Sequence, residues 1–432
     1  MLKTSASQKD QPPARRRILS AALLLAAALP LRAATTNDVA EEIRLLREEN
    51  GLLKTQVKQQ GEQLDILNHK VSNLETASGT EPPTKESFPS FNRVNLGGEG
   101  GVGYAITGPD GAVPNGQFRV DDARLFVEAP LWTDVYFYGE LLLATQESPG
   151  MSAQLGELYV EFENISKLWH QDNQLNARLG QINTPFGEEY LVRNPIDNPL
   201  ITHSLADFWC VTPGAELYGN LGKFTYVVAA QNGGENAGGD KAVAGRIGFD
   251  PNEHWHFSVS GMRTGNLQAG PFSLSQMWFG NGFFRSIGSP MTTQFHAEAV
   301  EGDLTARWKS GQVSTAGGWA GYHDNDPLGG NSRNAFYYSA EAVQNLPKKF
   351  FAATRWSQVF CHGGIPVVGY GNFDDYFFGP LTTELWRLSL GLGYRFNDRL
   401  VLKTEYSFER GRTTGGNRQN EDFFGTEAAF KF

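Results

Sequence analysis

Short segments in which apolar and polar residues alternate recur along most of this chain, and they constrain its fold more than any other feature. The final segment places Phe424, Thr426, Ala428, Phe430 and Phe432 on one side of an extended strand. The other side carries Phe423, Gly425, Glu427, Ala429 and Lys431. Alternation over about ten residues is typical of a strand with one face in lipid and the other in water. The last strand of a soluble sandwich can look similar, so the other segments have to decide.

Counting such segments predicts sixteen strands. They lie near 92–106, 117–130, 134–144, 153–163, 174–182, 213–219, 223–231, 240–249, 254–263, 298–309, 312–322, 334–345, 349–361, 384–396, 399–410 and 422–432. Two of them, 213–219 and 298–309, are weak, so fourteen or eighteen strands stay possible. In the clearest segments, one side is apolar and the other holds charges that need water, as at Arg387, Arg395, Lys403 and Glu405. We therefore predict an all-β fold, a transmembrane antiparallel β-barrel of about sixteen strands with a wet lumen.

The links between these segments alternate in length. Links after even-numbered strands are short, apart from 164–173, whereas links after odd-numbered strands are longer, as at 183–212 and 264–297. This asymmetry is typical of outer-membrane barrels, whose short turns face the periplasm. Because the strand count is even, the chain enters and leaves the barrel on that periplasmic side.

Composition agrees with a barrel and excludes other classes. Hydrophobic residues make up 40% of the 432 residues, which is too polar for a helical membrane protein, whereas 12% aromatic residues and 49 glycines suit a barrel. The net charge of −10 argues against nucleic acid as a partner.

The amino-terminal region predicts export and self-association. Residues 1–34 resemble a secretory signal, with Arg15–Arg17 before the apolar run 18–29 and cleavage expected after Ala33 or Ala34. Residues 38–78 carry an unbroken heptad seam with polar core positions at Asn50 and Gln60, which predicts a periplasmic coiled coil. An amphipathic helix packed on its own domain is the alternative. A linker, 79–90, then leads to the barrel domain, 91–432.

The long link 183–212 is the candidate constriction. A sixteen-stranded barrel is wide enough for an aqueous channel, and a loop folded into it would narrow it. The apolar content of this link favours an inward fold over an outward surface loop. Its charged and titratable candidates are Glu188, Glu189, Arg193, Asp197, His203 and Asp207.

Two segments carry a specific resemblance. Residues 118–127 (FRVDDARLFV), followed by the tyrosine-rich 135–139, and residues 180–187 (GQINTPFG) resemble the phosphate-selective porin O and P family. The resemblance covers about 91–432, and it implies a sixteen-stranded trimeric outer-membrane channel. In the phosphate-selective members of the family, a ladder of basic residues lines the lumen and selects anions such as phosphate. This chain departs from that ladder, because residues 91–432 hold 25 Lys and Arg against 36 Asp and Glu.

The expected lumen residues on the strands are therefore of mixed charge and predict no ion sign. The candidates on the strands are Arg124, Glu128, Arg178, Arg307, Arg355, Arg387, Arg395 and Lys403, beside further carboxylates such as Glu140, Glu157, Glu161, Asp303, Glu341 and Glu405.

Motifs for catalysis or metal binding are not recognisable. The eight histidines show no HExxH or metal spacing, and no Gly-x-Ser-x-Gly elbow occurs. We expect neither an enzyme nor a cofactor. Cys210 and Cys361 could pair in an oxidising compartment or remain free thiols.

These observations predict an outer-membrane porin for passive diffusion of small hydrophilic solutes or ions. Expected partners are outer-membrane lipid, two further copies in a homotrimer, and the barrel-assembly machinery, which would read Phe430 and Phe432. An envelope tether, with the barrel as anchor for the coiled coil, is the alternative function. A soluble secreted β-rich binding protein is a third.

Overall fold

The computed structural model describes residues 94–145, 153–232, 240–268, 274–279, 282–285, 287, 291–372 and 379–432. The predicted signal peptide, coiled coil and linker lie outside the described residues. Within these ranges no helix is long and apolar enough to cross a membrane.

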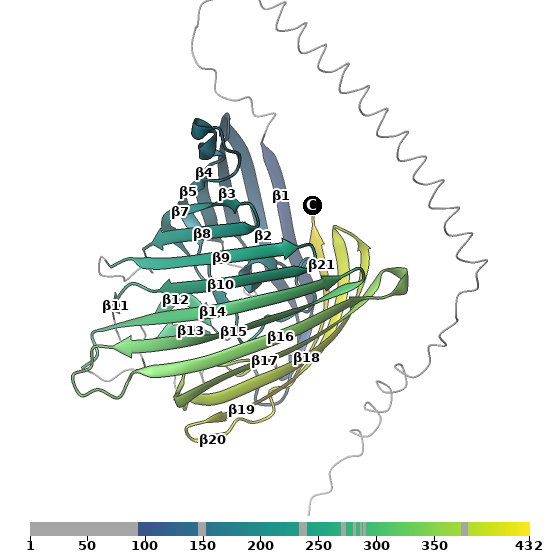
Figure 1. Ribbon diagram of the computed structural model, residues 1–432. Coiled ribbons are helices and arrows are strands. Elements are labelled where there is room, and N and C mark those ends of the chain that lie inside the picture. The colour runs from purple at the N-terminus through teal and green to yellow at the C-terminus, as the bar shows by residue number, and fades with distance from the viewer. Residues whose placement is uncertain are drawn as a thin grey trace, which may run out of the picture. The chain divides into compact units, whose positions relative to one another are not determined.

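Sixteen antiparallel strands close into one barrel (Figure 1). They are β1 (Asn95–Thr107), β2 (Gln117–Trp132), β3 (Val135–Leu142), β4 (Gln154–Phe162), β5 (Asn176–Asn183), β7 (Val211–Leu221), β8 (Phe224–Gln231), β9 (Ala242–Asn252), β10 (Trp255–Arg263), β14 (Gln294–Trp308), β15 (Gly311–Asp324), β16 (Arg333–Asn345), β17 (Phe350–Ile365), β18 (Thr382–Asn397), β19 (Leu400–Thr413) and β21 (Phe423–Lys431). The predicted count of sixteen is confirmed. The two weak segments are full strands, and both extend further than predicted.

Short elements complete the described chain. The strands β6 (Phe208–Trp209), β12 (Leu274–Phe279) and β13 (Gly282–Arg285) form a separate small sheet, and β11 (Leu267–Gln268) and β20 (Gly416–Asn417) extend the barrel. Three single 3₁₀ turns occur at η3 (Ile165–Trp169), η4 (Glu189–Val192) and η5 (Pro347–Lys349).

The barrel closes where its first and last strands pair. β21 pairs with β1 from Glu99 opposite Lys431 to Thr107 opposite Phe423, and Figure 1 shows the two strands side by side. Beyond β21, the Phe432 N–H donates to the Gly98 carbonyl at 2.9 Å. The predicted pairing of the last strand with the first is therefore confirmed.

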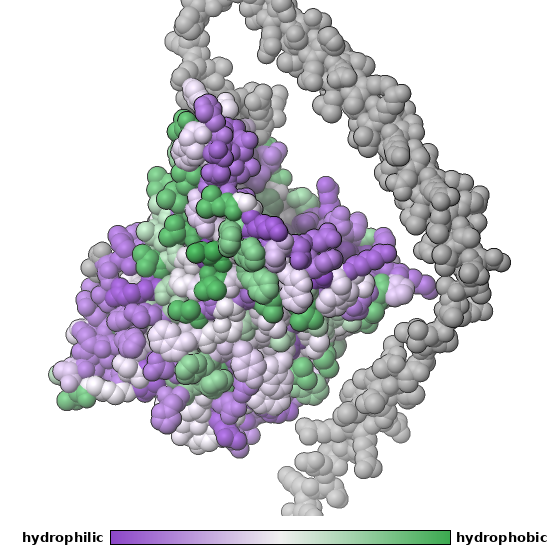
Figure 2. Space-filling model, viewed as in Figure 1, coloured by the Kyte–Doolittle hydropathy of each residue, from purple (hydrophilic) through white to green (hydrophobic). Residues whose placement is uncertain are grey.

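Outward and inward positions alternate as predicted. Large apolar side chains face outward along the middle of the strands, among them Leu179, Leu217, Val228, Ile247, Val259, Val300, Leu390 and Leu402. Exposed aromatic side chains stand near the short turns, including Trp132, Trp255, Trp308, Phe350 and Phe396. Figure 2 shows hydrophobic side chains across the middle of the visible face and hydrophilic ones towards its edges. An apolar band bordered by aromatics is the surface that a barrel presents to a bilayer.

The interior is not uniformly wet. A buried apolar cluster lines the inside of β14 to β18 and includes Phe186 and Leu205 from the link after β5. Strands β15 and β16 supply Tyr322 and Tyr337, and Phe295 comes from β14. Part of the lumen is therefore filled, and this filling determines where a passage can run.

Candidate functional site

The link between β5 and β6 lies inside the barrel. Leu205 and Asp207 have 0% exposure, and residues 193–207 are mostly buried, although they belong to no strand. We call residues 184–207 the lumen loop. A loop without strand pairing has many backbone groups to satisfy, so side chains of the wall must supply the hydrogen bonds.

Strand β19 supplies the first set of these bonds. The Glu405 carboxylate accepts bonds from the backbone N–H of Ile201 at 2.6 Å and of Thr202 at 2.9 Å, and from the Thr202 hydroxyl at 2.6 Å. Two residues earlier, the Lys403 ammonium donates to the carbonyl oxygens of Pro195 and Leu200 at 2.7 and 2.9 Å. Period two places both side chains on the inner face of the strand.

The neighbouring strands hold the loop further along. Arg355 on β17 donates to the Thr202 carbonyl at 2.6 Å, and Arg387 on β18 donates to the His203 carbonyl at 2.9 Å. Each guanidinium also pairs with a carboxylate of an adjacent strand, Arg355 with Glu341 at 2.5 Å and Arg387 with Glu409 at 2.6 Å. Each of these buried arginines therefore has a carboxylate partner that offsets the cost of burying its charge.

The loop also binds to itself. Arg193 pairs with Asp207 at 2.7 Å, and the Glu189 carboxylate accepts bonds from the N–H and hydroxyl of Ser204. Burial tends to raise the pKa of Glu189, but Arg355 and the Ser204 bonds outweigh it, so the pKa is lowered. Burial raises the pKa of Asp207, although Arg193 opposes this. These contacts join residues 189–193 of the loop to residues 204–207.

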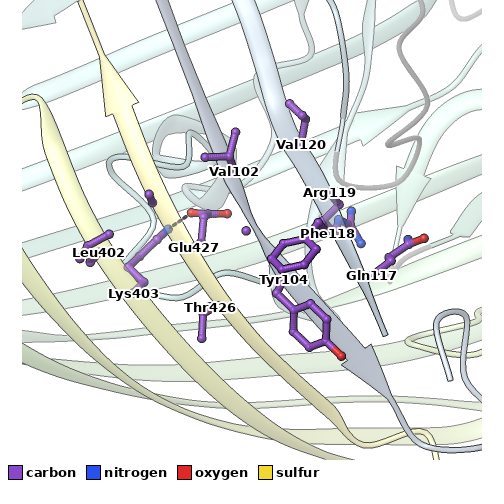
Figure 3. Close-up of a pocket in the computed structure, with 12 residues that line it drawn as sticks. Val102, Tyr104, Gln117, Phe118, Arg119, Val120, Leu402, Lys403, Thr426 and Glu427 are labelled. Atoms are coloured by element: carbon purple, nitrogen blue, oxygen red, sulfur yellow. Dashed lines mark ion pairs between the residues drawn. The ribbon is translucent and has the colours of Figure 1, made fainter. Parts of the chain in front are cut away.

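The closing seam shows the same compensation. Lys403 pairs with Glu427 of β21 at 2.8 Å, drawn as a dashed line in Figure 3. Beside this pair lies a recess of about 980 Å³, which is bordered by the outward side chains Val102, Phe118 and Leu402. Three basic groups, those of Arg355, Arg387 and Lys403, are therefore covered by the lumen loop, and each is paired with a carboxylate of the wall.

The other side of the loop faces open lumen. Leu191 and Val192 are 50% and 45% exposed, on a segment whose other end is buried against β17 to β19. Beside them the Tyr190 ring contacts Arg246 of β9, with 5.3 Å from the guanidinium carbon to the ring centroid. The exposed side of the loop therefore faces the inner side of β1 to β9, which we call the open wall.

The open wall carries a row of aromatic rings joined by an arginine. The rings of Phe126, Tyr138 and Tyr159 stack across β2, β3 and β4, with centroids 6.3 and 5.1 Å apart. Arg178 on β5 then lies over the Tyr159 ring at 5.0 Å and over the Tyr218 ring of β7 at 4.7 Å. The Tyr138 hydroxyl donates to Glu140 at 3.2 Å and the Tyr218 hydroxyl donates to Glu161, so the row is bonded to the carboxylates of the wall.

Carboxylates surround the arginines of this wall. Arg124 pairs with Glu99 at 2.9 Å and contacts Glu140 at 3.5 Å. Likewise, Arg178 pairs with Glu161 at 2.9 Å and contacts Glu216 at 3.3 Å. Neither guanidinium is left without an acidic neighbour, which holds both side chains in place.

Near the lumen loop, Glu188 completes this arrangement. It contacts Arg246 at 3.4 Å and His256 of β10 at 3.1 Å. The same histidine also lies 2.8 Å from Asp250 of β9. This group ties the start of the loop to the open wall.

The structure sorts the predicted residues into three groups. Arg124, Arg178, Glu188 and Asp197 lie at the open wall or on exposed parts of the loop. Buried in or under the loop are Arg193, His203, Asp207, Arg355, Arg387 and Lys403, and Glu189 is half-buried beside them. Glu128, Arg307 and Arg395 are exposed near the short turns.

Sequence reasoning did not single out three groups of the site, Glu216, Arg246 and His256. The alternation in β9 was a usable signal, because Ala242, Ala244 and Arg246 share the inward side. Cys210 and Cys361 lie in one apolar cluster and are unbridged.

These features define the class of the barrel: a sixteen-stranded outer-membrane type with a long loop bound inside its lumen. No protein-family model matches this sequence, and no curated sequence shows significant similarity to it. Solved structures do resemble it in fold. The outer-membrane channel DcaP of Acinetobacter baumannii aligns with a TM-score of 0.53 and 14% identity, over 81% of this chain and 100% of that one.

Two further structures give similar values. OmpT of Vibrio cholerae, in its trimer form, has a TM-score of 0.52 and 10% identity over 78% of this chain and 99% of its own. OprB of Pseudomonas putida has a TM-score of 0.51 and 10% identity over 79% and 94%. The chain thus has a porin fold, while membership of the phosphate-selective porin O and P family stays a prediction.

Proposed function

We propose that this protein is an outer-membrane porin through which small hydrophilic solutes or ions diffuse passively. The observation that carries the proposal is the lumen loop, which β17 to β19 hold along residues 195–203 and β9 and β10 hold at Glu188, while Leu191 and Val192 between them stay exposed. Such an arrangement narrows a wide barrel without sealing it. The fold similarity to outer-membrane channels supports the same function.

Planar-bilayer recording of the purified full-length protein tests this proposal. We expect discrete conductance steps in KCl from folded protein, which runs at a different position in a gel before and after heating. Heat-unfolded protein in the same detergent is the control and should give none. Folded protein that inserts into the bilayer and yields no steps would exclude a channel.

The proposal extends to assembly as a homotrimer in the outer membrane, with residues 38–78 in the periplasm. Its support is the heptad seam and the trimer form of OmpT named above. Deleting residues 38–78 tests the role of the seam. Loss of trimers in a native gel indicates an assembly device, whereas intact conducting trimers with a blebbing envelope would favour the tether.

A further inference from the structure

We propose that the passage prefers cations over anions, with the carboxylates of the open wall as the residues that set this preference. The inference rests on the proposed channel function and concerns its specificity. This preference is opposite to the anion preference expected of a lumen lined by a ladder of basic residues. Two separate observations lead to it, one on each side of the lumen.

The first observation is that the lumen loop removes basic groups from the passage. Arg387 is 1% exposed and Lys403 is 5% exposed. Their hydrogen bonds go to loop carbonyls and to Glu409 and Glu427, as described above. Each of these cations is paired with a wall carboxylate, so the pairs add no net positive charge beside the passage.

The second observation is the charge balance of the open wall. Three guanidiniums, those of Arg124, Arg178 and Arg246, stand there among six carboxylates. The carboxylates are Glu99, Glu140, Glu157, Glu161, Glu188 and Glu216. Counted as formal charges, the six carboxylates exceed the three guanidiniums by three, and each guanidinium already contacts at least one carboxylate.

Basic residues near the short turns do not cancel this effect. Arg307 and Arg395 are exposed at the short-turn end of the barrel, and Arg395 reaches the lumen loop only through the Phe351 ring, which lies 5.7 Å from its guanidinium carbon and packs against Ile196. The screening length is about 8 Å at physiological salt, so charges in the wide mouth act weakly on an ion beside the loop. The narrow section therefore sets the sign.

The expected size of the preference follows from Coulomb's law. A negative excess of up to three charges at about 10 Å, screened by 0.1 M salt, favours a monovalent cation over an anion about two- to four-fold. In 1 M salt the screening length is about 3 Å, and the preference should nearly vanish.

Reversal potentials in a KCl gradient across a planar bilayer test the inference. The wild-type channel should show a potassium-to-chloride permeability ratio of about two to four at a mean concentration near 0.1 M. The triple variant Glu140→Gln, Glu161→Gln, Glu216→Gln should bring this ratio to one or below. Single Glu161→Gln should shift it part of the way, which keeps the test available if the triple variant folds poorly.

Glu253→Gln is the matched control, because it makes the same substitution at an exposed short turn. Its permeability ratio should equal the wild-type ratio. Conductance with chloride preference or none, or an unchanged ratio in the folded triple variant, overturns the cation preference and leaves the channel standing. Absence of any conductance overturns the channel and, with it, this inference.

Discussion

The hold of Glu405 on the lumen loop can be tested by Glu405→Gln. Its carboxylate accepts three bonds from Ile201 and Thr202, and a fourth from the Ser407 hydroxyl at 2.6 Å. The amide of glutamine keeps one acceptor oxygen and turns its N–H groups towards donors. Each hydrogen bond to a charged group contributes about 1.5–3 kcal/mol, so the substitution should weaken the anchoring by about 3–5 kcal/mol.

This loss should change how often the loop leaves the wall. A change of about 1.4 kcal/mol alters a population ten-fold, so the detached population should rise about a hundred-fold to a few thousand-fold. Lys403, Arg355 and Arg387 still hold the loop. The loop should therefore stay attached to the wall most of the time and detach only briefly. Single-channel recording should then show frequent larger steps, and liposome swelling should admit larger sugars.

Glu384→Gln is the control for this prediction. It makes the same change on β18, where the Glu384 carboxylate accepts a bond from Gln358 at 3.0 Å and does not contact the loop. This variant should conduct as the wild type does. An unchanged step size and size limit in the folded Glu405→Gln variant, together with equal resistance of the loop to protease, would refute the reasoning.

Three other perturbations have defined outcomes. Gly103→Val should reduce the yield of folded barrel in heat-shift gels, because a Cβ at Gly103 would clash with the Thr426 carbonyl oxygen of β21; a normal yield would contradict the closure geometry. Deleting Phe432 should lower the amount of trimer in the outer membrane without changing the conductance of those that form, and normal amounts would count against its role in assembly. The lowered pKa of Glu189 means that its contribution to loop stability is present above about pH 4.5 and is lost as the pH falls further. Protease cleavage of the loop should therefore increase at pH 3 with an acid protease, and in Glu189→Gln it should be high at both pH values.

Alternation along the sequence predicted the barrel because period two is a local property that each strand carries by itself. It identified the inward position of Lys403 and Glu405 and the outward position of Leu402, which the structure confirms. At β2 the simple period fails, since a bulge at Asp122, with a φ of 41°, shifts the phase between Phe118 and Leu125. A bulge depends on the register of the partner strand, which alternation does not reveal.

The site was harder to predict than the fold. Sequence patterns marked Arg178 and Arg387 alike as inward residues, yet Arg178 borders water with 30% of its side chain exposed and Arg387 is buried under the loop. The difference arises from where the lumen loop rests, and that position depends on contacts with residues about two hundred positions away. No local pattern contains such contacts.

The anchors of the lumen loop have a consequence for biogenesis. The chain makes the loop before β10, but Lys403 and Glu405 belong to the penultimate barrel strand, and Lys403 pairs with Glu427 of the last one. Contacts between such distant parts of the chain form late, since loop-closure entropy must first be overcome. In an unfinished barrel the loop would therefore lack these contacts. The width of the lumen would become defined only when the first and last strands pair. Closure of the barrel and fixing of the pore width would then occur in the same step.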